Sequence, residues 1–245
     1  MLKDLKINLI YFLKLFYSKI FYLFIFRPTV GSSYWFIKKE IYFGGYKKNI
    51  KRKIVSNLDH RSSSEITQGG MTGGDRMLIH GYASNYSKHL SNYTKDYLNK
   101  FNILEIGILE GTGLAVWAET FPNSNIYGAD IDLSNFESNK INLISKSNNI
   151  LENIEVFKFD QLEPYKYEIN QIKKNSLDIV IDDGLHSKDS IIKTAKFLKP
   201  YLSDEFVYFI EDVNFDLLDS VKLIFPNSKL YESGKLIVVS NILKK

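Results

Sequence analysis

The sequence has no cysteine among its 245 residues. Disulfide bonds, thiolate nucleophiles and thiolate zinc sites are therefore excluded. The composition, 44% hydrophobic and 24% charged, is typical of a globular protein. A chain of this length can hold one domain of ordinary size and an appendage.

Acidic residues are scarce near the N-terminus. Residues 1–61 contain 13 Lys and Arg against 3 Asp and Glu, whereas the rest contains 19 against 25. We therefore predict a basic, aromatic extension over residues 1–61 and an acidic body over residues 62–245, with the serine- and glycine-rich residues 61–74 linking them. This pattern is typical of a domain with a surface-seeking extension and disfavours a nucleic-acid binder.

The extension also lacks an uninterrupted apolar run. Residues 7–26 are mostly apolar and aromatic, but Lys14 and Lys19 interrupt them. Each lysine would cost about 2.5–3.5 kcal/mol in a spanning helix, and no small-x-small cleavage site follows for a signal peptide. We predict a helix in the membrane interface, with the basic residues 47–53 attracting anionic lipid. Packing on the body or a homo-oligomer contact is the alternative.

In the body, apolar runs alternate with helical patterns. Five strands are predicted, at residues 103–106, 126–130, 154–159, 177–181 and 206–210. Helices are predicted at residues 82–100, 113–121, 134–148, 188–198 and 215–225. This alternation predicts a parallel sheet covered on both faces. Residues 228–231 and 236–240 are so close in sequence that they can only form an antiparallel hairpin.

The first predicted strand runs into a glycine-rich turn. Its pattern is Glu105-x-Gly107-x-x-x-Gly111-x-Gly113, and the next strand ends in Asp130. An acid in that position grips the ribose hydroxyls of a nucleoside cofactor. The spacing differs from the dinucleotide fingerprint, and Glu105 would repel a pyrophosphate but suit a cationic sulfonium. The turn therefore favours S-adenosylmethionine (SAM).

Two polar clusters follow the fourth and fifth predicted strands. Residues 182–186 read Asp-Asp-Gly-Leu-His, and Glu211 is followed by Asp212. Because parallel strands end at one edge of the sheet, we expect these side chains to meet. Four carboxylates and an imidazole favour a hard divalent cation, Mg²⁺ or Mn²⁺, that polarises a substrate hydroxyl while His186 acts as the base. A metal-free cluster that holds a polar substrate is the alternative.

Over residues 72–245 the chain resembles class I SAM-dependent methyltransferases in its glycine turn, strand-end acids and terminal hairpin. It resembles in particular the metal-dependent macrolide-sugar O-methyltransferases of the mycinamicin type. These carry an Asp-Asp-Gly-x-His run, a later Glu-Asp pair and an upstream Gly-Thr-Asp-Lys…His-x-Tyr segment. Here residues 72–76 read Thr-Gly-Gly-Asp-Arg and residues 80–82 read His-Gly-Tyr, with an extra glycine and with arginine in place of lysine.

The resemblance implies a Rossmann-like α/β fold with seven strands in the order 3-2-1-4-5-7-6 and strand 7 antiparallel. It implies that His186 and Asp183 are catalytic and that the metal ligands are Asp183, Glu211 and Asp212. Asp130 would take the ribose and Asp160 the adenine, while Asp182 faces the SAM carboxyl end or only caps a helix. The full set implied for the cofactor is Glu105, Gly107, Gly111, Gly113, Asp130, Asp160, Asp182 and Tyr82.

We predict an O-methyltransferase for a hydroxyl of a sugar or of a small polar, nucleotide-linked metabolite, in surface-glycan or secondary-metabolite biosynthesis. It would work in the cytoplasm, where SAM is available, or on the inner face of the membrane. Nucleic acid is not an expected substrate, because the motif at residues 182–184 is Asp-Asp-Gly and not the Asn/Asp-Pro-Pro-aromatic run used on base amines. A catechol-type O-methyltransferase and a non-catalytic membrane adaptor of the same fold are the alternatives.

Overall fold

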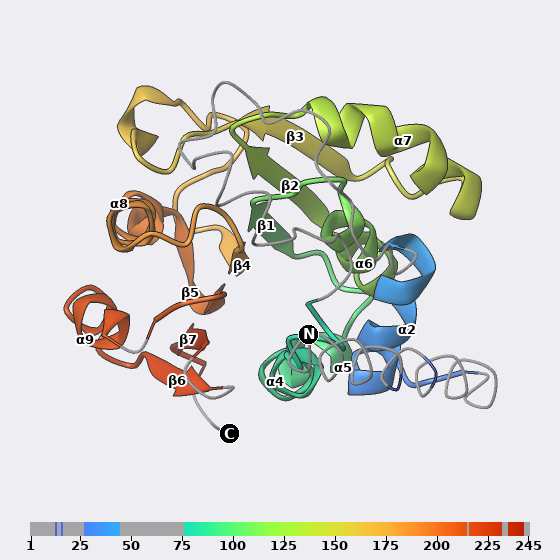
Figure 1. The fold of residues 1–245 in the computed structure, drawn as a ribbon, viewed down its shortest axis with the longest axis horizontal. Helices are drawn as coiled ribbons and strands as arrows, with labels where there is room; N and C mark the ends of the chain where they lie inside the picture. The colour runs from blue at the N-terminus through green and yellow to red at the C-terminus, as the bar shows by residue number, and fades with distance from the viewer. Residues whose placement is uncertain are drawn as a thin grey trace, which may run out of the picture.

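A seven-stranded sheet forms the centre of the computed structural model, which describes residues 13, 16, 27–44, 76–214, 216–231 and 235–242. The strand order is β3-β2-β1-β4-β5-β7-β6 (Figure 1). The strands are β1 Asn102–Ile106, β2 Asn125–Asp130, β3 Ile154–Lys158, β4 Leu177–Asp182, β5 Leu202–Ile210, β6 Lys229–Tyr231 and β7 Leu236–Ser240.

Strands β1 to β5 run parallel to one another, and β7 runs antiparallel between β5 and β6. Ile103 of β1 pairs with Ile126 on one side and with Ile179 on the other. Val207 of β5 pairs with Ser240 of β7 in the opposite sense. The predicted strand order and the antiparallel seventh strand are therefore confirmed.

Helices cover both faces of the sheet (Figure 1). One layer contains α2, α4, α5, α6 and α7, and the other contains α8 and α9. Two short 3-10 turns, η1 and η2, lie in the connections. The bounds are α2 Ser33–Gly44, α4 Ala83–His89, α5 Ser91–Lys95, α6 Thr112–Thr120, α7 Ser134–Lys146, η1 Pro164–Lys166, α8 Lys188–Leu198, η2 Lys199–Tyr201 and α9 Leu217–Lys222.

Strand β5 shows how the sheet separates two apolar cores. Val207 and Phe209 belong to the core under α6, whereas Tyr208 and Ile210 belong to the core under α8 and α9. All four side chains are fully buried. Side chains alternate between the two faces of a strand, so a strand buried on both faces is apolar throughout and not alternately polar.

Helix α2 lies within the predicted extension but packs on the body. Its Phe36 is fully buried in the core that contains α6. Its Trp35 Nε1 donates a hydrogen bond to Thr120 Oγ1 at 3.0 Å. At least α2 therefore belongs to the packed body, while the predicted boundary between residues 61 and 62 lies outside the described residues.

Three predicted elements differ most from the structure in their bounds. The helix predicted at residues 82–100 is divided into α4 and α5 at Leu90, whose φ of −89° and ψ of 0° interrupt the helix. The last helix, α9, is shorter than predicted. Strand β5 begins at Leu202, earlier than predicted, because Asp204 and Glu205 hide its first half from an apolar pattern.

In the part of the chain that the structure describes, no helix is both long enough and apolar enough to cross a membrane. The predicted interface helix at residues 7–26 lies outside that part, except for Leu13 and Phe16, which are helical and exposed. The basic run at residues 47–53 and the predicted linker at residues 61–74 also lie outside it. The membrane prediction therefore stays a prediction.

Candidate functional site

The turn after β1 has a backbone that favours glycine. Gly107 and Gly111 have φ angles of 82° and 79°, in the left-handed region that side chains rarely adopt. A Cβ atom on Gly107 would lie 2.1 Å from the backbone oxygen of Asp183, and one on Gly113 would lie 2.2 Å from Oε1 of Glu105. Gly107 therefore lets the turn pack directly against the loop after β4, and Gly113 leaves room for the carboxylate of Glu105.

Asp130 lies at the end of β2, as the sequence predicts for the ribose acid. Its Oδ2 accepts hydrogen bonds from the backbone N–H groups of Ile108 (2.9 Å) and Leu109 (3.1 Å) in the glycine turn. Its Oδ1 accepts one from the N–H of Asp132 at 3.1 Å. Asp130 therefore holds the turn in place. Each carboxylate oxygen has more than one acceptor site, so the ribose contact stays an open prediction.

Glu105 is buried and has both oxygens engaged inside the protein. Its Oε1 accepts a hydrogen bond from Arg76 Nη2 at 2.7 Å, and its Oε2 accepts one from Trp117 Nε1 at 2.6 Å. Burial raises the pKa of Glu105, and Arg76 opposes that rise. In the structure Glu105 is therefore a buried partner of Arg76. The predicted contact of Glu105 with the SAM amino group stays a prediction.

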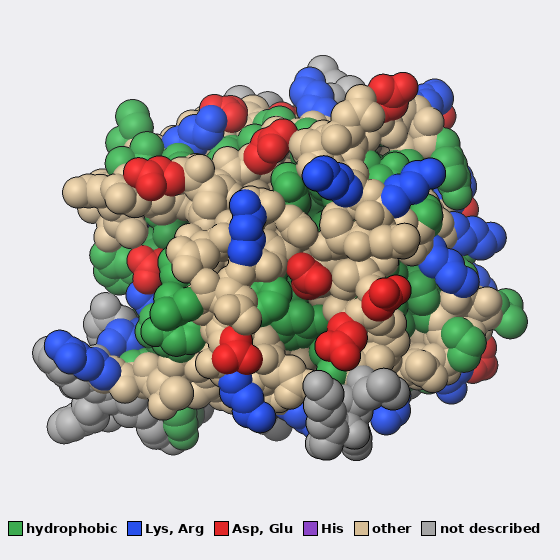
Figure 2. All heavy atoms as spheres, turned by 180° about the vertical axis from the view of Figure 1, so that it is seen from behind, with side chains coloured by type: hydrophobic (Ala, Val, Ile, Leu, Met, Phe, Trp, Pro, Cys, Tyr) green, Lys and Arg blue, Asp and Glu red, His purple; other side chains and the backbone are tan. Residues whose placement is uncertain are grey.

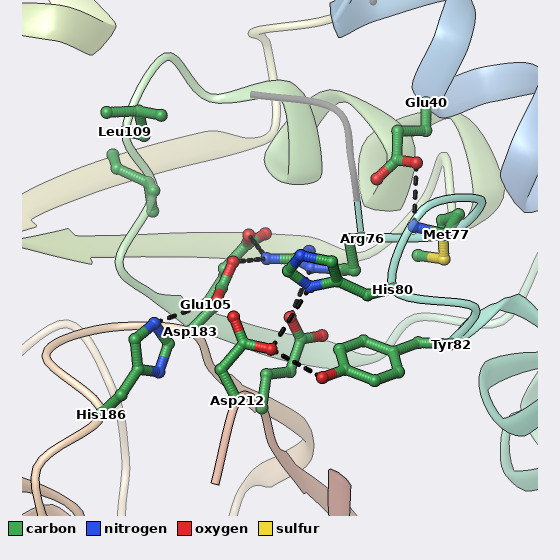
Figure 3. Close-up of polar contacts among 12 residues, drawn as sticks. Glu40, Arg76, Met77, His80, Tyr82, Glu105, Leu109, Asp183, His186 and Asp212 are labelled. Atoms are coloured by element: carbon green, nitrogen blue, oxygen red, sulfur yellow. Dashed lines mark hydrogen bonds and ion pairs between the residues drawn. The ribbon is translucent and has the colours of Figure 1, made fainter. Parts of the chain in front are cut away.

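Arg76 stands among carboxylates from three different elements (Figure 3). Besides Glu105, its guanidinium contacts Asp183 Oδ2 at 2.7 Å and Glu211 Oε2 at 2.9 Å. Only 9% of the Arg76 side chain is exposed. Burial alone would lower the pKa of Arg76, but the three carboxylates raise it, so the guanidinium stays charged.

The role of Arg76 is not among the predictions made from the sequence. The available signal was its place in the upstream segment, where the resembling enzymes have lysine. A guanidinium can bridge several carboxylates with its planar fork, which an ammonium cannot do in the same way. The departure from the motif is therefore at the residue that organises the cluster.

Glu211, a predicted metal ligand, is also buried with both oxygens engaged. Its Oε1 accepts a hydrogen bond from the Tyr86 hydroxyl, and its Oε2 binds Arg76. Burial raises the pKa of Glu211 well above its usual range, although Arg76 opposes that rise. Tyr86 stacks on Phe209 with ring centroids 4.2 Å apart, which fixes its hydroxyl. The role of Tyr86 carried no sequence signal.

A second group lies on the more open side of the cluster. Asp183, His186 and Asp212 each offer one ligand atom, and these atoms all lie within 4.8 Å of one another. Nε2 of His186 is 3.7 Å from Oδ1 of Asp183. His186 and Asp212 have left-handed backbones, with φ of 59° and 49°, a strain that is found at functional sites. Two carboxylates and an imidazole at this spacing fit a divalent cation.

Asp212 is held by two residues of the segment before α4. The Tyr82 hydroxyl donates to its Oδ1 at 2.6 Å, and Nδ1 of His80 lies 3.3 Å from the same oxygen (Figure 3). Burial would raise the pKa of Asp212, but His80 and Tyr82 lower it below its usual range. Asp212 therefore stays ionised. Tyr82, predicted to contact the cofactor, contacts Asp212 here.

Asp182 and Asp160 are bound within the protein. Asp182 is buried beside α8 and accepts hydrogen bonds from Gln161 Nε2 at 2.7 Å and from the Tyr208 hydroxyl at 3.1 Å. Asp160 Oδ1 accepts one from the N–H of Leu162 at 2.8 Å. These contacts are structural, and the predicted contacts of both acids with SAM stay predictions.

The sequence matches no protein-family model. It is 27% identical over 144 residues to the mycinamicin VI 2''-O-methyltransferase of Micromonospora griseorubida, which covers 56% of this chain and 32% of the relative. It is 25% identical over 148 residues to the 8-demethyl-8-α-L-rhamnosyl tetracenomycin-C 2'-O-methyltransferase of Streptomyces olivaceus, which covers 58% and 35%. The chain thus spans about a third of the length of these curated relatives.

Among solved structures, the chain is similar to the MycE methyltransferase of the mycinamycin pathway in complex with Mg, SAH and mycinamycin VI. The TM-score is 0.52 at 21% identity, and the match covers 78% of this chain and 55% of that one. The chain therefore has the fold of the class I SAM-dependent methyltransferases and is a distant sequence relative of macrolide-type sugar O-methyltransferases.

Proposed function

We propose that the chain is a SAM-dependent O-methyltransferase for a hydroxyl of a sugar or of another small polar metabolite, including nucleotide-linked ones. One observation carries the proposal: the glycine turn touches the loop that bears the acid–imidazole group, since a Cβ atom on Gly107 would lie 2.1 Å from the backbone oxygen of Asp183. A cofactor at the turn would have its reacting end beside Asp183 and His186. Open α/β sheets bind their ligands at this edge.

The chemistry divides between the bound groups and the chain. SAM supplies a methyl group on a sulfonium, and a divalent ion would polarise the acceptor hydroxyl. The chain orients the acceptor and removes its proton. The imidazole of His186 accepts the hydroxyl proton, the freed oxygen pair forms the new C–O bond, and the C–S pair stays on sulfur. Asp183 Oδ1, 3.7 Å from Nε2, would stabilise the resulting imidazolium. Fixed proximity supplies much of the acceleration.

A divalent ion would be held by Asp183 and Asp212. Mg²⁺ commonly uses one or two carboxylates and keeps several waters, so two acids at the open side of the cluster suffice. His186 lies within reach of the same ion. As the proposed base, His186 needs a free imidazole nitrogen and is therefore not assigned as a ligand of the ion. Glu211 is not assigned to the ion here, because Arg76 and Tyr86 bind its oxygens.

Sugar-type acceptors are favoured over the rival substrates. Both relatives named above are O-methyltransferases, one of them named for a rhamnosyl compound. The cluster consists of carboxylates and an imidazole, which bind polar hydroxyls. Figure 2 shows acidic side chains near the centre of the face opposite to that of Figure 1, with basic side chains around them. We place the acceptor among surface-glycan precursors or secondary metabolites.

A peripheral position on the inner face of the membrane is part of the proposal and rests on the sequence of residues 7–26 and 47–53. Deleting residues 1–27 leaves α2 in the chain. This deletion should release the protein from anionic vesicles and leave SAM binding intact. Loss of SAM binding in the shortened protein would instead make the segment part of the fold.

The decisive test is a panel of acceptors. Nucleotide sugars, glycosylated macrolides and surface-glycan precursors are incubated with SAM and the full chain, and S-adenosylhomocysteine (SAH) is measured. Catechols and an RNA duplex serve as the comparison arms. SAH formation with a sugar acceptor supports the proposal, and formation only with catechol supports the catechol-type alternative. SAH binding without turnover of any acceptor would support a non-catalytic adaptor.

A further inference from the structure

The three carboxylates around Arg76 differ in what they leave open. Glu105 and Glu211 have both oxygens bound inside the protein. The two oxygens of Asp183 have different surroundings. Its Oδ2 contacts Arg76, whereas its Oδ1 faces Nε2 of His186. The cluster therefore has an inner part that Arg76 satisfies and an outer part that remains for a ligand.

Burial separates the same two parts. The side chains of Glu105 and Glu211 are 2% and 1% exposed, whereas those of Asp183 and Asp212 are 28% and 31% exposed. An ion that keeps several waters must enter from the exposed side. The two oxygens of Glu211 are bound by Tyr86 and Arg76, so an ion could bind Glu211 only by displacing one of these partners.

Arg76 is anchored by its surroundings. The backbone N–H of the next residue, Met77, donates to the buried carboxylate of Glu40 in α2 at 2.9 Å. The carbonyl of Arg76 accepts a hydrogen bond from the N–H of Tyr82 at 3.3 Å. Its guanidinium lies 6.0 Å from the ring centre of Trp117. Moving Arg76 would also leave buried carboxylates without a cation, which is strongly destabilising.

We propose that Arg76 is the resident cation of this centre, that Glu211 is its buried partner and not a metal ligand, and that a divalent ion binds Asp183 and Asp212 against the charge of Arg76. This inference rests on the proposed function only in that a divalent ion binds the cluster. Arg76 is thus a positioning residue that fixes Asp183 and limits the affinity for metal.

Binding of Mn²⁺ to the full chain, followed by its electron spin resonance without acceptor, tests this assignment. Arg76→Gln removes the charge at a similar size, and Arg76→Lys keeps the charge as the matched control. Because a nearby positive charge opposes cation binding, Arg76→Gln should bind Mn²⁺ at least about tenfold more tightly, and Arg76→Lys within about threefold of the unaltered protein. Unchanged or weaker binding by Arg76→Gln overturns the proposal.

A second pair of variants keeps the test decisive if Arg76→Gln does not fold, which SAH calorimetry and thermal unfolding will show. Both variants are titrated with Mn²⁺. The loss of Mn²⁺ affinity caused by Asp212→Asn should be at least about tenfold larger than the loss caused by Glu211→Gln. Equal losses of affinity in the two variants would make Glu211 a ligand and reject the proposal. A lack of Mn²⁺ binding by the unaltered protein would also reject the proposal.

The two proposals fail separately. If sugar acceptors yield SAH but the Mn²⁺ results differ from these expectations, the roles given to Arg76 and Glu211 are wrong while the proposed function stands. If no acceptor yields SAH, the proposed function is rejected, and the Mn²⁺ titrations still decide the role of Arg76.

Discussion

The backbone N–H of Met77 donates a hydrogen bond to Oε2 of Glu40, 2.9 Å away, and both residues are buried. Glu40 belongs to α2, which packs beside α6, whereas Met77 directly follows Arg76. This bond links a helix from the predicted extension to the residue next to Arg76, which organises the carboxylate cluster. The N-terminal region therefore contributes to the site through its packing.

Removing that hydrogen bond should lower the stability of the protein. Glu40→Ala leaves a buried N–H without its acceptor, which should lower the free energy of unfolding by about 1–3 kcal/mol. Glu40→Gln keeps an acceptor and should retain most of the stability. Urea unfolding measures both. Glu119→Gln is the control, because it breaks the 2.6 Å pair of Lys39 with Glu119 near the surface of α2 and should cost at most about 1 kcal/mol. Equal losses for Glu40→Ala and Glu119→Gln would contradict a special role of the Glu40 bond.

Asp130→Ala should weaken SAM binding by about tenfold or more. The predicted role of the carboxylate is to accept hydrogen bonds from the ribose hydroxyls, and charged hydrogen bonds contribute about 1.5–3 kcal/mol each. It also holds the N–H groups of Ile108 and Leu109 in the glycine turn. Titration calorimetry with SAM measures the change, with the thermal midpoint recorded beside it. An unaltered affinity would remove Asp130 from the cofactor site.

His186→Ala should lower the rate of methyl transfer by about 10²–10⁴-fold, the usual range for the loss of a general base. SAH binding should change little, because the proposed base would act on the acceptor and not on the cofactor. Initial rates of SAH formation and calorimetry separate the two effects. Lys188→Ala, at an exposed position two residues further along, is the control and should keep its rate. Full activity of His186→Ala would require another base.

Removal of divalent ions should reduce methyl transfer by about tenfold or more, since polarisation of the acceptor hydroxyl is lost. Rates are measured after EDTA treatment and again after addition of Mg²⁺ or Mn²⁺, which should restore them. Turnover that persists in EDTA would leave a metal-free carboxylate cluster as the acceptor site, the alternative open at the level of sequence.

Asp182 should make stability depend on pH. Burial raises the pKa of Asp182 to about 6, whereas an ordinary aspartate has about 4. The folded protein therefore holds this proton more tightly than the unfolded chain, so the contribution of Asp182 is fully present below about pH 4 and is lost as the pH rises to about 6. Asp182→Asn cannot titrate. The difference in free energy of unfolding, Asp182→Asn minus the unaltered protein, should therefore rise by about 3 kcal/mol from pH 4 to pH 7. Urea unfolding across this range measures it, and a constant difference would contradict the shift.

The local patterns predicted most of the sheet. Strands such as β1 and β4 are buried on both faces, so their apolar runs identify them without any knowledge of their neighbours. The turn at Gly107 and Gly111 is equally local, because its left-handed backbone favours glycine at these positions. The beginning of β5 was missed because Asp204 and Glu205 carry its exposed side chains and mask the strand.

The sequence by itself determined the elements, the hairpin, the glycine turn and the acids at the strand ends, since each depends on residues close together in the chain. Only the tertiary structure decided how those acids are used. Arg76 meets Glu105, Asp183 and Glu211 across 29, 107 and 135 positions of sequence. Such contacts depend on which side chains the fold brings together in a buried space. There a cation must be matched to the carboxylates, whatever their order along the chain.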